Sequence, residues 1–174
     1  MINKLVEEIK IRGGFARSNK FSIEISRGNN NNMATNTDVI NVLCESVSLP
    51  GKQITTTEYS IARNNIKYPT GYINEDVELS FALTNDYYIR KYFDEWIDSI
   101  IPSKDYYLNY RTEYVRDVTI TQLGEKNEKI YSHKLIDAYP ITMQNIALSN
   151  SVDDDVSRFS VTLTYDKYEI INHK

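Results

Sequence analysis

Residues 84–102 are the one stretch of this sequence whose apolar residues recur with the spacing of an α-helix. The large apolar residues of this stretch lie three or four positions apart, and they are Ile89, Phe93, Trp96, Ile97 and Ile100. Asn85 or Asp86 is placed to cap the first turn, and Pro102 is placed to end the helix. Full burial of each large apolar side chain stabilises a fold by about 1.5–3 kcal/mol, so these residues need a sheet to pack against. The stretch therefore predicts a helix over residues 85–101 that braces a β-sheet core.

Elsewhere the apolar residues mostly alternate with polar ones, which is the pattern of half-buried β-strands. The segments with this pattern span residues 21–26, 39–48, 77–83, 114–123, 129–138, 141–148 and 156–169. Pro50-Gly51 and residues 124–128 are turn signals, and Pro140 is expected to end the strand before it. About seven or eight short strands with one helix are typical of a β-sandwich or open barrel. The sequence therefore predicts a mainly β fold.

A chain of 174 residues that is 41% hydrophobic and 25% charged is long enough to bury a core of its own. We expect residues 1–14 to form an N-terminal arm or short helix and residues 15–170 to form a single β domain. The formal net charge of −4 argues against a protein that grips nucleic acid through its phosphates. The 14 tyrosines favour surfaces that meet other proteins, because tyrosine joins an apolar ring to a polar tip.

The chemically reactive residues do not form a recognisable site. His133 stands in a predicted strand with no Cys or carboxylate at ligand spacing, and His173 belongs to the C-terminal tail. Cys44 is alone in the chain, so it has no disulfide partner and is expected to be a small buried apolar residue. The three aspartates at 153–155 lack the spaced ligands and the glycine of an EF-hand loop. The sequence therefore predicts no enzyme and no catalytic, cofactor-binding or metal site.

Several short motifs stand in a fixed order along the chain. They are Phe15-Ala16-Arg17-x-Asn19-x-Phe21, the strand with Cys44, Leu49-Pro50-Gly51, Pro69-Thr70-Gly71, Phe93-x-x-Trp96, Tyr139-Pro140-Ile141-Thr142 and the strand at 159–165. Each motif is common in β domains, so a family resemblance rests on the order and spacing of the whole set. From about Phe15 to Tyr168 the chain resembles the tail tube protein of T4-like contractile-tailed bacteriophages. It departs from that pattern at residues 29–38, which lengthen the first hairpin loop.

The resemblance implies a structural subunit that polymerises as stacked hexameric rings and forms the conduit for DNA ejection inside a contractile sheath. The implied partners are copies of the chain itself, the tail sheath protein, baseplate tube-initiator proteins, a tape-measure protein in the lumen and the tail terminator. Genomic DNA would pass through without specific binding, and no cofactor is implied. The subunit would be made in the host bacterial cytoplasm and would reside in the virion tail. Six subunits with four strands each would close a sheet on the order of 37 Å across, since strands are spaced ~4.8 Å apart.

Residues 53–75 contain no large apolar cluster, and an irregular stretch of this length is uncommon in a compact domain. It is either a plain excursion with one short hairpin or, as the resemblance implies, a projecting loop that contacts the next subunit or ring. The ring-stacking residues expected from the resemblance are Leu49, Pro50, Gly51, Lys52, Gln53, Ile54, Tyr59, Tyr68 and Tyr72. The acidic turn adds Asp153, Asp154 and Asp155 as a further expected contact.

A lumen that lets DNA slide needs short side chains that are polar and neutral or acidic, because a basic lining would hold the phosphates. Two strand faces have this character, and the lumen-facing candidates on them are Glu78, Ser80, Ala82, Asp117, Thr119 and Thr121.

Two other functions are compatible with the sequence. A baseplate protein that initiates the tube, or the inner-tube protein of a phage-like injection machine, would share the fold and differ in its partners. A ligand-binding β-sandwich, such as a carbohydrate module, would use exposed aromatic residues, and the tyrosine content permits it. Glycan binding by a monodisperse monomer would favour the carbohydrate module.

Overall fold

The computed structural model describes residues 14–27, 37–61, 64–103, 107–146 and 156–173, together with residues 7, 8, 10 and 11. The described strands are β1 (Phe21–Ile25), β2 (Cys44–Val47), β3 (Lys52–Ile61), β4 (Asn64–Asn74), β5 (Val77–Ala82), β6 (Arg116–Leu123), β7 (Lys129–Met143), β8 (Arg158–Thr164) and β9 (Lys167–Asn172). The described helices are α2 (Thr37–Leu43), α3 (Tyr88–Ile100) and α4 (Arg111–Tyr114). The predicted mainly β fold is confirmed. Most of the predicted N-terminal arm lies outside the described residues, and the division at residue 15 stays a prediction.

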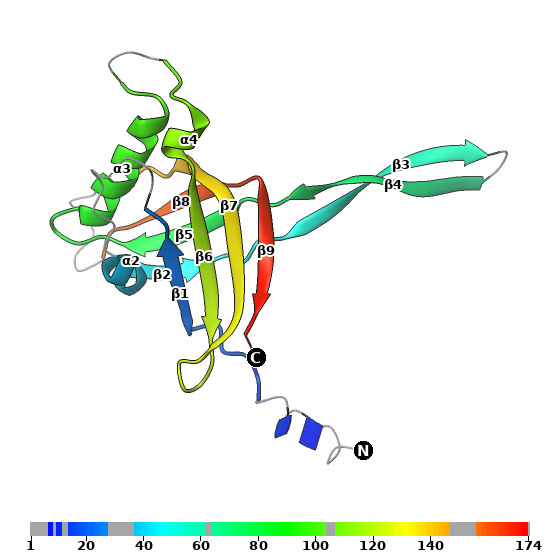
Figure 1. Ribbon diagram of the computed structural model, residues 1–174, viewed down its shortest axis with the longest axis horizontal. Coiled ribbons are helices and arrows are strands. Elements are labelled where there is room, and N and C mark those ends of the chain that lie inside the picture. Colours follow the sequence, from blue (N-terminus) through cyan, green and yellow to red (C-terminus); the bar gives the residue numbers. More distant parts are fainter. Residues whose placement is uncertain are drawn as a thin grey trace.

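One seven-stranded sheet bends over on itself into two layers (Figure 1). Its strands follow the order β1-β6-β7-β8-β5-β2, and β9 also pairs with β7. Layer A comprises β1, β6, β9 and the first part of β7, whereas layer B comprises β2, β5, β8 and the last part of β7. All of these pairs are antiparallel. The strands of the two layers cross in Figure 1, and the core lies between them.

The core takes every second residue of the paired strands. Layer A contributes Ile23, Ile25, Val118, Ile120 and Leu135, and layer B contributes Val77, Leu79, Phe81, Phe159, Val161 and Leu163. The residues between them face outward, which is the alternation that the sequence shows. The two layers therefore share one hydrophobic core and have two outward faces.

Helix α3 lies within the predicted range 85–101 and ends before Pro102, as the sequence predicts. Its Ile89, Phe93 and Trp96 are fully buried, whereas Ile97 and Ile100 are half-buried. At its start, the carboxylate of Asp86 accepts hydrogen bonds from the Thr84 hydroxyl and from the Tyr88 backbone N–H. These hydrogen bonds lower the pKa of Asp86, because they favour its charged form. None of the described helices is long and apolar enough to cross a membrane.

The range 39–48, predicted as one strand, is instead helix α2 followed by strand β2. Ile40, Leu43 and Cys44 stand three and four positions apart and all turn toward the core. Asp38 lies in the first turn of α2, where its negative charge stabilises the helix by interacting with the positive end of the helix dipole. The strand prediction was wrong because a short apolar run fits the period of a helix as well as that of a strand.

Strand β7 continues through Pro140, so the prediction that this proline ends a strand was wrong. β6 pairs with β7 only as far as Ala138, and the ladder to β8 is irregular between Pro140 and Thr142. Just before this point Asp137 adopts a left-handed conformation with φ of 55°, and the chain passes from layer A to layer B. A proline is tolerated here because β7 has already lost its neighbour on the β6 side.

The range 156–169, predicted as one long strand, contains β8 and the start of β9. β8 pairs within layer B and β9 pairs within layer A, and Tyr165 and Asp166 stand between them. The Tyr165 hydroxyl donates a hydrogen bond of 2.8 Å to the carbonyl of Glu75, and burial raises the pKa of Tyr165 to about 12. The strand breaks because the chain must change layers at this buried tyrosine.

Candidate assembly surfaces

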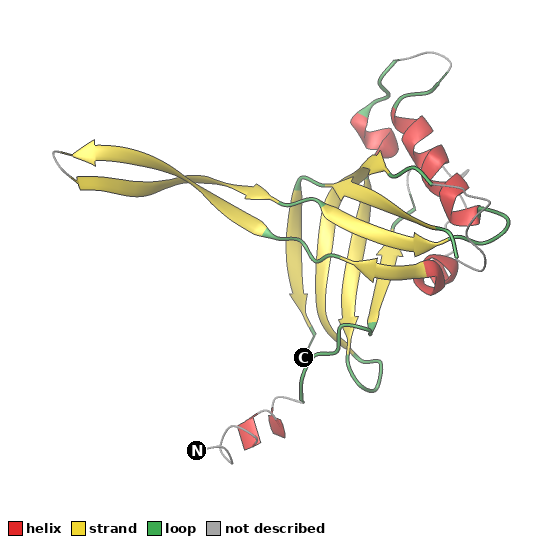
Figure 2. Cartoon of the chain, turned by 180° about the vertical axis from the view of Figure 1, so that it is seen from behind, coloured by secondary structure: helices red, strands yellow, loops and turns green. Residues whose placement is uncertain are grey.

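Strands β3 and β4 form a separate hairpin that projects from the two layers (Figure 2). Residues 53–75 are therefore not an irregular excursion, since most of them lie in two long paired strands. At about 3.3 Å per residue, a strand of ten residues extends about 33 Å. A two-stranded hairpin is at best marginally stable in water, so it gains stability when another surface covers it.

Large apolar side chains are exposed from the root of the hairpin as far as Tyr59 and Ile66. They are Ile54, Tyr59, Ile66, Tyr68, Tyr72 and Ile73. Of the predicted contact residues, Ile54 is 63% exposed and Tyr68 is 47% exposed. Sequence reasoning did not include Ile66 in the contact set, although its position two residues from Tyr68 places both on one face of a strand. An exposed apolar surface of this kind is typical of a site that binds another protein.

The outer half of the hairpin has one apolar face and one polar face. Tyr59 pairs with Ile66, and Thr57 pairs with Tyr68, so these side chains share a face. The rings of Tyr59 and Tyr68 meet edge to face, with their centroids 5.8 Å apart. The opposite face carries Glu58 and Lys67. These two residues face each other in the register and form an ion pair at 3.2 Å. The hairpin is therefore amphipathic in its outer half.

The root of the hairpin is held against the turn between β8 and β9. The backbone N–H of Glu75 donates to the carbonyl of Gly51 at 3.0 Å, and the Asn74 side chain donates to the carbonyl of Asp166 at 3.2 Å. These bonds fix the direction in which the hairpin leaves the layers.

The predicted contact residues at this root differ in their exposure. Leu49, Lys52 and Gln53 are exposed, Gly51 is half-buried and Pro50 is buried. The ammonium group of Lys52 lies 4.0 Å from the ring centroid of Tyr72. This cation–π contact covers one face of the Tyr72 ring. Asp153, Asp154 and Asp155 lie outside the described residues, so their predicted contact stays a prediction.

The six predicted lumen residues lie on the outward faces of two different layers. Glu78, Ser80 and Ala82 belong to β5 in layer B, and Asp117, Thr119 and Thr121 belong to β6 in layer A. Because the layers pack against each other around one core, their outward faces point away from each other. A single bore can therefore be lined by one of the two sets, and not by both.

The outward face of layer B is built mainly of short side chains. Hydroxyl residues lie side by side across β2, β5, β8 and β7, and they are Ser46, Ser80, Ser160, Thr162 and Thr142. Arg158, at the edge of this group, is ion-paired at 2.7 Å with Glu45. Layer B therefore presents a smooth polar surface.

The outward face of layer A carries longer, charged side chains. Lys134 lies 2.8 Å from the carboxylate of Asp117, and Lys129 lies 3.1 Å from that of Glu24. The neighbouring carboxylate raises the pKa of Lys134, because it favours the protonated amine. Thr121 is buried on this face although the sequence predicts it to be in contact with a lumen.

The free edges of the two layers also differ. The backbone N–H of Ile23, at the outer edge of β1, donates to the side-chain oxygen of Asn41 in α2, so this edge of layer A is blocked. In layer B, none of the described strands pairs with the outer edge of β2. The edge of β7 that pairs with β6 as far as Ala138 also has no partner among the described strands beyond that residue. Layer B therefore has an edge at each end to which a strand can add.

The family model described as phage tail tube protein matches residues 16–171, which is most of the chain. This chain belongs to the phage tail tube protein family. The family predicted from the ordered motifs is confirmed, and the matched range contains all nine of the described strands except the last residue of β9. Tail tube proteins are structural subunits, so this tail tube protein is not an enzyme.

Solved structures share the fold of this tail tube protein at low sequence identity. A chain of the anti-feeding prophage baseplate, six-fold symmetrised, is 15% identical with a TM-score of 0.66, over 91% of this chain and 96% of that chain. A chain of the sheath–tube complex of PVC, an extracellular contractile injection system, is 17% identical with a TM-score of 0.66, over 96% and 97%. A chain of the anti-feeding prophage cap is 18% identical with a TM-score of 0.63, over 91% and 92%. A comparison with curated protein sequences found no match.

The histidines and the cysteine of this tail tube protein have structural surroundings. His133 is buried between the rings of Tyr131 and Tyr168, whose centroids lie 4.8 Å and 5.4 Å away, and burial lowers its pKa. His173 forms a hydrogen bond of 2.8 Å with the Ser132 hydroxyl. Burial raises the pKa of the Cys44 thiol to about 12. Within the described residues, no group of three His, Cys, Asp or Glu side chains is placed to hold a metal ion.

Proposed function

We propose that this tail tube protein closes into hexameric rings that stack into a hollow tube inside the contractile sheath of a T4-like phage tail. The tube would be the conduit through which DNA leaves the virion. The observation that carries this proposal is the projecting β3–β4 hairpin, whose exposed apolar residues find no cover in the described part of the chain. A hairpin of this kind gains stability when a second copy covers it.

Ring closure is assigned to layer B, because it has a free edge at both ends. The outer edge of β2 in one copy would pair with the last part of β7 in the next. Layer A is less suited, because Asn41 already occupies the edge of β1 at Ile23. This contact joins two different surfaces of the same chain, and such head-to-tail contacts close into rings when the rotation allows it.

The bore is assigned to the outward face of layer B, so that Glu78, Ser80 and Ala82 would line it. Layer B contributes four strands, and six copies would form a sheet on the order of 37 Å across before strand tilt widens it. Its short hydroxyl side chains leave most of that width open to a DNA duplex. By contrast, the lysines on layer A would hold phosphates and slow the passage of DNA.

The remaining partners follow from this arrangement. The outward face of layer A would be turned toward the tail sheath protein, and the ends of the tube would meet the baseplate tube-initiator proteins and the tail terminator. A tape-measure protein would occupy the lumen before DNA does. The subunit would be made in the host bacterial cytoplasm and assembled there into the virion tail.

A second candidate is the tube, baseplate or cap protein of a phage-like injection machine. The structures that support it are those of the anti-feeding prophage and PVC, which share this fold over nearly the whole chain. The two candidates differ in what passes through the bore and in which genes accompany this one. Neighbouring genes for a head and a DNA-packaging motor would favour the phage tail.

The proposal is tested by removing the hairpin without disturbing the layers. Gln53 and Ile73 face each other in the register, so residues 54–72 can be replaced by Asn-Gly, a two-residue hairpin turn. We expect a folded monomer that forms no tubes in negative-stain electron microscopy. The matched control is Glu58→Ala, which alters only the polar face and should keep the tubes. Normal tubes from the shortened protein would overturn the role of the hairpin.

A further inference from the structure

His133 stands on the inward face of layer A with one ring nitrogen unsatisfied. It lies two residues before Leu135 of the core, and its side chain is 5% exposed. Its Nδ1 has no hydrogen-bond partner among the described residues. Burial is the cause of its lowered pKa, because a buried imidazole disfavours the charged form. His133 is therefore neutral at pH 7 and gains a charge only in acid.

The ring of Tyr168 contacts both His133 and the root of the β3–β4 hairpin. Its centroid lies 5.4 Å from that of the imidazole and 5.8 Å from the ammonium of Lys52, the first residue of β3. The ring of Tyr131 packs edge to face on the imidazole from 4.8 Å away. A cation within about 6 Å of an aromatic ring is attracted by its π-system. Lys52 therefore holds the hairpin root on Tyr168 while His133 is neutral.

The other side-chain contacts that tie the root to the layers go to the same short segment. The Asn74 amide donates to the carbonyl of Asp166 at 3.2 Å. The Tyr165 hydroxyl donates to the carbonyl of Glu75 at 2.8 Å, and its ring lies 6.2 Å from that of Tyr168. In the described part of the chain, the direction of the hairpin therefore depends on the segment from Tyr165 to Tyr168.

Among the described residues, no carboxylate offsets a charge on His133. Its neighbours on β6, β7 and β9 are uncharged side chains, and they are Ile120, Tyr131, Leu135, Tyr168 and Ile170. The carboxylates of Glu75 and Asp76, beside the hairpin root, act on Tyr165 instead. A proton on the imidazole would therefore add an uncompensated positive charge.

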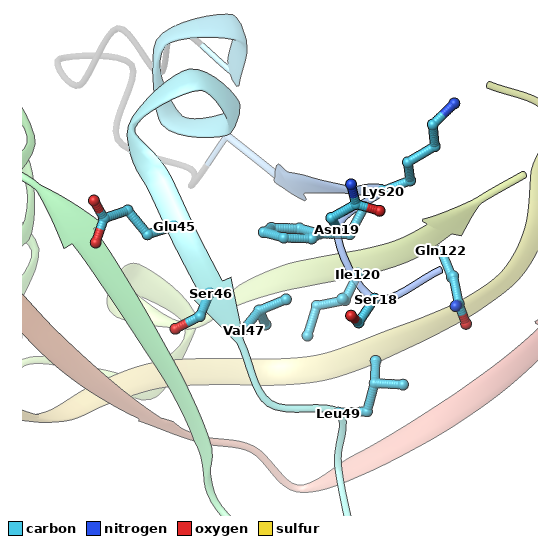
Figure 3. A pocket seen from close by; sticks show the side chains of 10 residues that line it. Ser18, Asn19, Lys20, Glu45, Ser46, Val47, Leu49, Ile120 and Gln122 are labelled. Atoms are coloured by element: carbon cyan, nitrogen blue, oxygen red, sulfur yellow. The ribbon is translucent and has the colours of Figure 1, made fainter. Parts of the chain in front are cut away.

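A cavity gives the hairpin root room to shift. It measures about 520 Å³ and lies between layer A and the segment that leads into β3 (Figure 3). Val47 and Leu49 line it on the side of that segment, and Ile120, which faces His133 in the register, lines it on the side of layer A. The segment before β3 is therefore not packed tightly against layer A, and the contacts to residues 165–168 hold the root in place.

We propose that His133 is a pH-sensitive lock on the direction of the β3–β4 hairpin. In acid the imidazole takes up a proton from water, so that two cations share the ring of Tyr168 and repel each other. Lys52 is exposed and yields, since it keeps its contact with Tyr72 inside the hairpin, 4.0 Å from that ring. The root then loses one of its holds on the layers. The lock belongs to the single chain and goes beyond the proposed tube function.

Distance measurement by electron spin resonance on dilute, monomeric protein tests the lock. One spin label is attached at Lys67→Cys in the outer half of the hairpin, and the other at Tyr110→Cys, an exposed position beside α4. Cys44 can stay in place, because it is buried and its thiol pKa is raised to about 12. We expect a narrow distance distribution at pH 7.5 and one at least twice as wide at pH 5. Fluorescence of Trp96, the one tryptophan, should show that the layers are still folded at both pH values.

The two histidines provide matched controls. His133→Phe should keep the narrow distribution at both pH values, whereas His173→Phe should broaden at pH 5 as the parent protein does. Lys52→Gln alters an exposed residue and leaves the core intact, and its distribution should not change with pH.

Three results would overturn the lock. They are an unchanged distribution of the parent protein at pH 5, broadening of the His133→Phe protein, and broadening that occurs only together with unfolding of the layers. Each would leave the tube function standing, because that function is tested separately by microscopy of the protein with the shortened hairpin.

Discussion

The indole N–H of Trp96 donates a hydrogen bond of 2.7 Å to the backbone carbonyl of Tyr114, inside the protein. This bond joins helix α3 to the residue that ends α4, just before β6 begins. The guanidinium of Arg116, the first residue of β6, lies 4.6 Å from the same indole ring. Trp96 is therefore one of the residues through which the helix and layer A are fixed to each other, and the Tyr92 hydroxyl, which accepts a hydrogen bond of 2.8 Å from Arg116, is another.

Trp96→Phe should keep most of the apolar packing and remove the hydrogen bond. The Tyr114 carbonyl would then be left without its donor, and an unsatisfied buried polar group costs about 1–3 kcal/mol. We expect the free energy of unfolding, measured by urea titration, to fall by that amount. Tyr110→Phe, at a side chain that is 81% exposed, is the control and should have little effect. Equal stabilities of Trp96→Phe and the wild type would contradict this role.

Asn41→Ala should expose the edge of β1. The side chain of Asn41 accepts the backbone N–H of Ile23, and its loss removes a hydrogen bond with a net value of about 1 kcal/mol. An unguarded strand edge also pairs with other chains, so we expect added self-association in analytical ultracentrifugation. Val42→Ala, one residue along and 83% exposed, is the control. A monodisperse Asn41→Ala protein of unchanged stability would show that α2 does not guard this edge.

The stability of the fold should fall on mild acidification because of His133. Its ordinary pKa is 6.5, and burial lowers this value in the folded protein, where Nδ1 has no hydrogen-bond partner among the described residues. Below pH 6.5 the unfolded chain therefore binds a proton that the folded chain does not. The free energy of unfolding falls as the pH drops below 6.5 and levels off below the folded pKa. His133→Phe should remove this slope in urea titrations between pH 5 and 7, and an unchanged slope would contradict the assignment.

A positive charge placed in the bore should hold DNA there. Thr162 lies on the outward face of layer B beside Glu78, and Thr119 lies on the outward face of layer A beside Lys134. We expect Thr162→Lys tubes assembled with a short DNA duplex to protect that duplex from nuclease, and added salt to release it. Thr119→Lys tubes should leave the duplex exposed. Protection by Thr119→Lys alone would assign the bore to layer A.

The sequence alone predicts the parts of the fold that are long and strictly periodic. Helix α3 follows from residues such as Ile89 and Phe93, and β5 follows from the alternation that begins at Val77. Helix α2 was missed because it has only seven residues, and its Val39 and Ile40 also suit a strand. Strand β7 was cut too early because Pro140 is a breaker only where both edges of a strand are paired.

The assembly surfaces are harder to predict because many of their apolar side chains stay exposed in the described part of the chain. Tyr59 and Tyr68 alternate with polar residues, yet no apolar cluster in the described part of the chain covers them. The two strand faces proposed for a lumen look alike in sequence, and only the fold places Ser80 and Thr119 on opposite layers. Their separation depends on the bend of the sheet at Asp137, which no local pattern indicates.

Electron microscopy of the purified protein at high concentration tests the central claim most directly. If the strand edges of layer B and the exposed apolar residues of the β3–β4 hairpin are completed by other copies, the micrographs will show hollow tubes with six-fold symmetry in cross-section and an open bore. Isolated monomers at every concentration, with no hollow assembly alone or in the presence of a tube initiator, would contradict it.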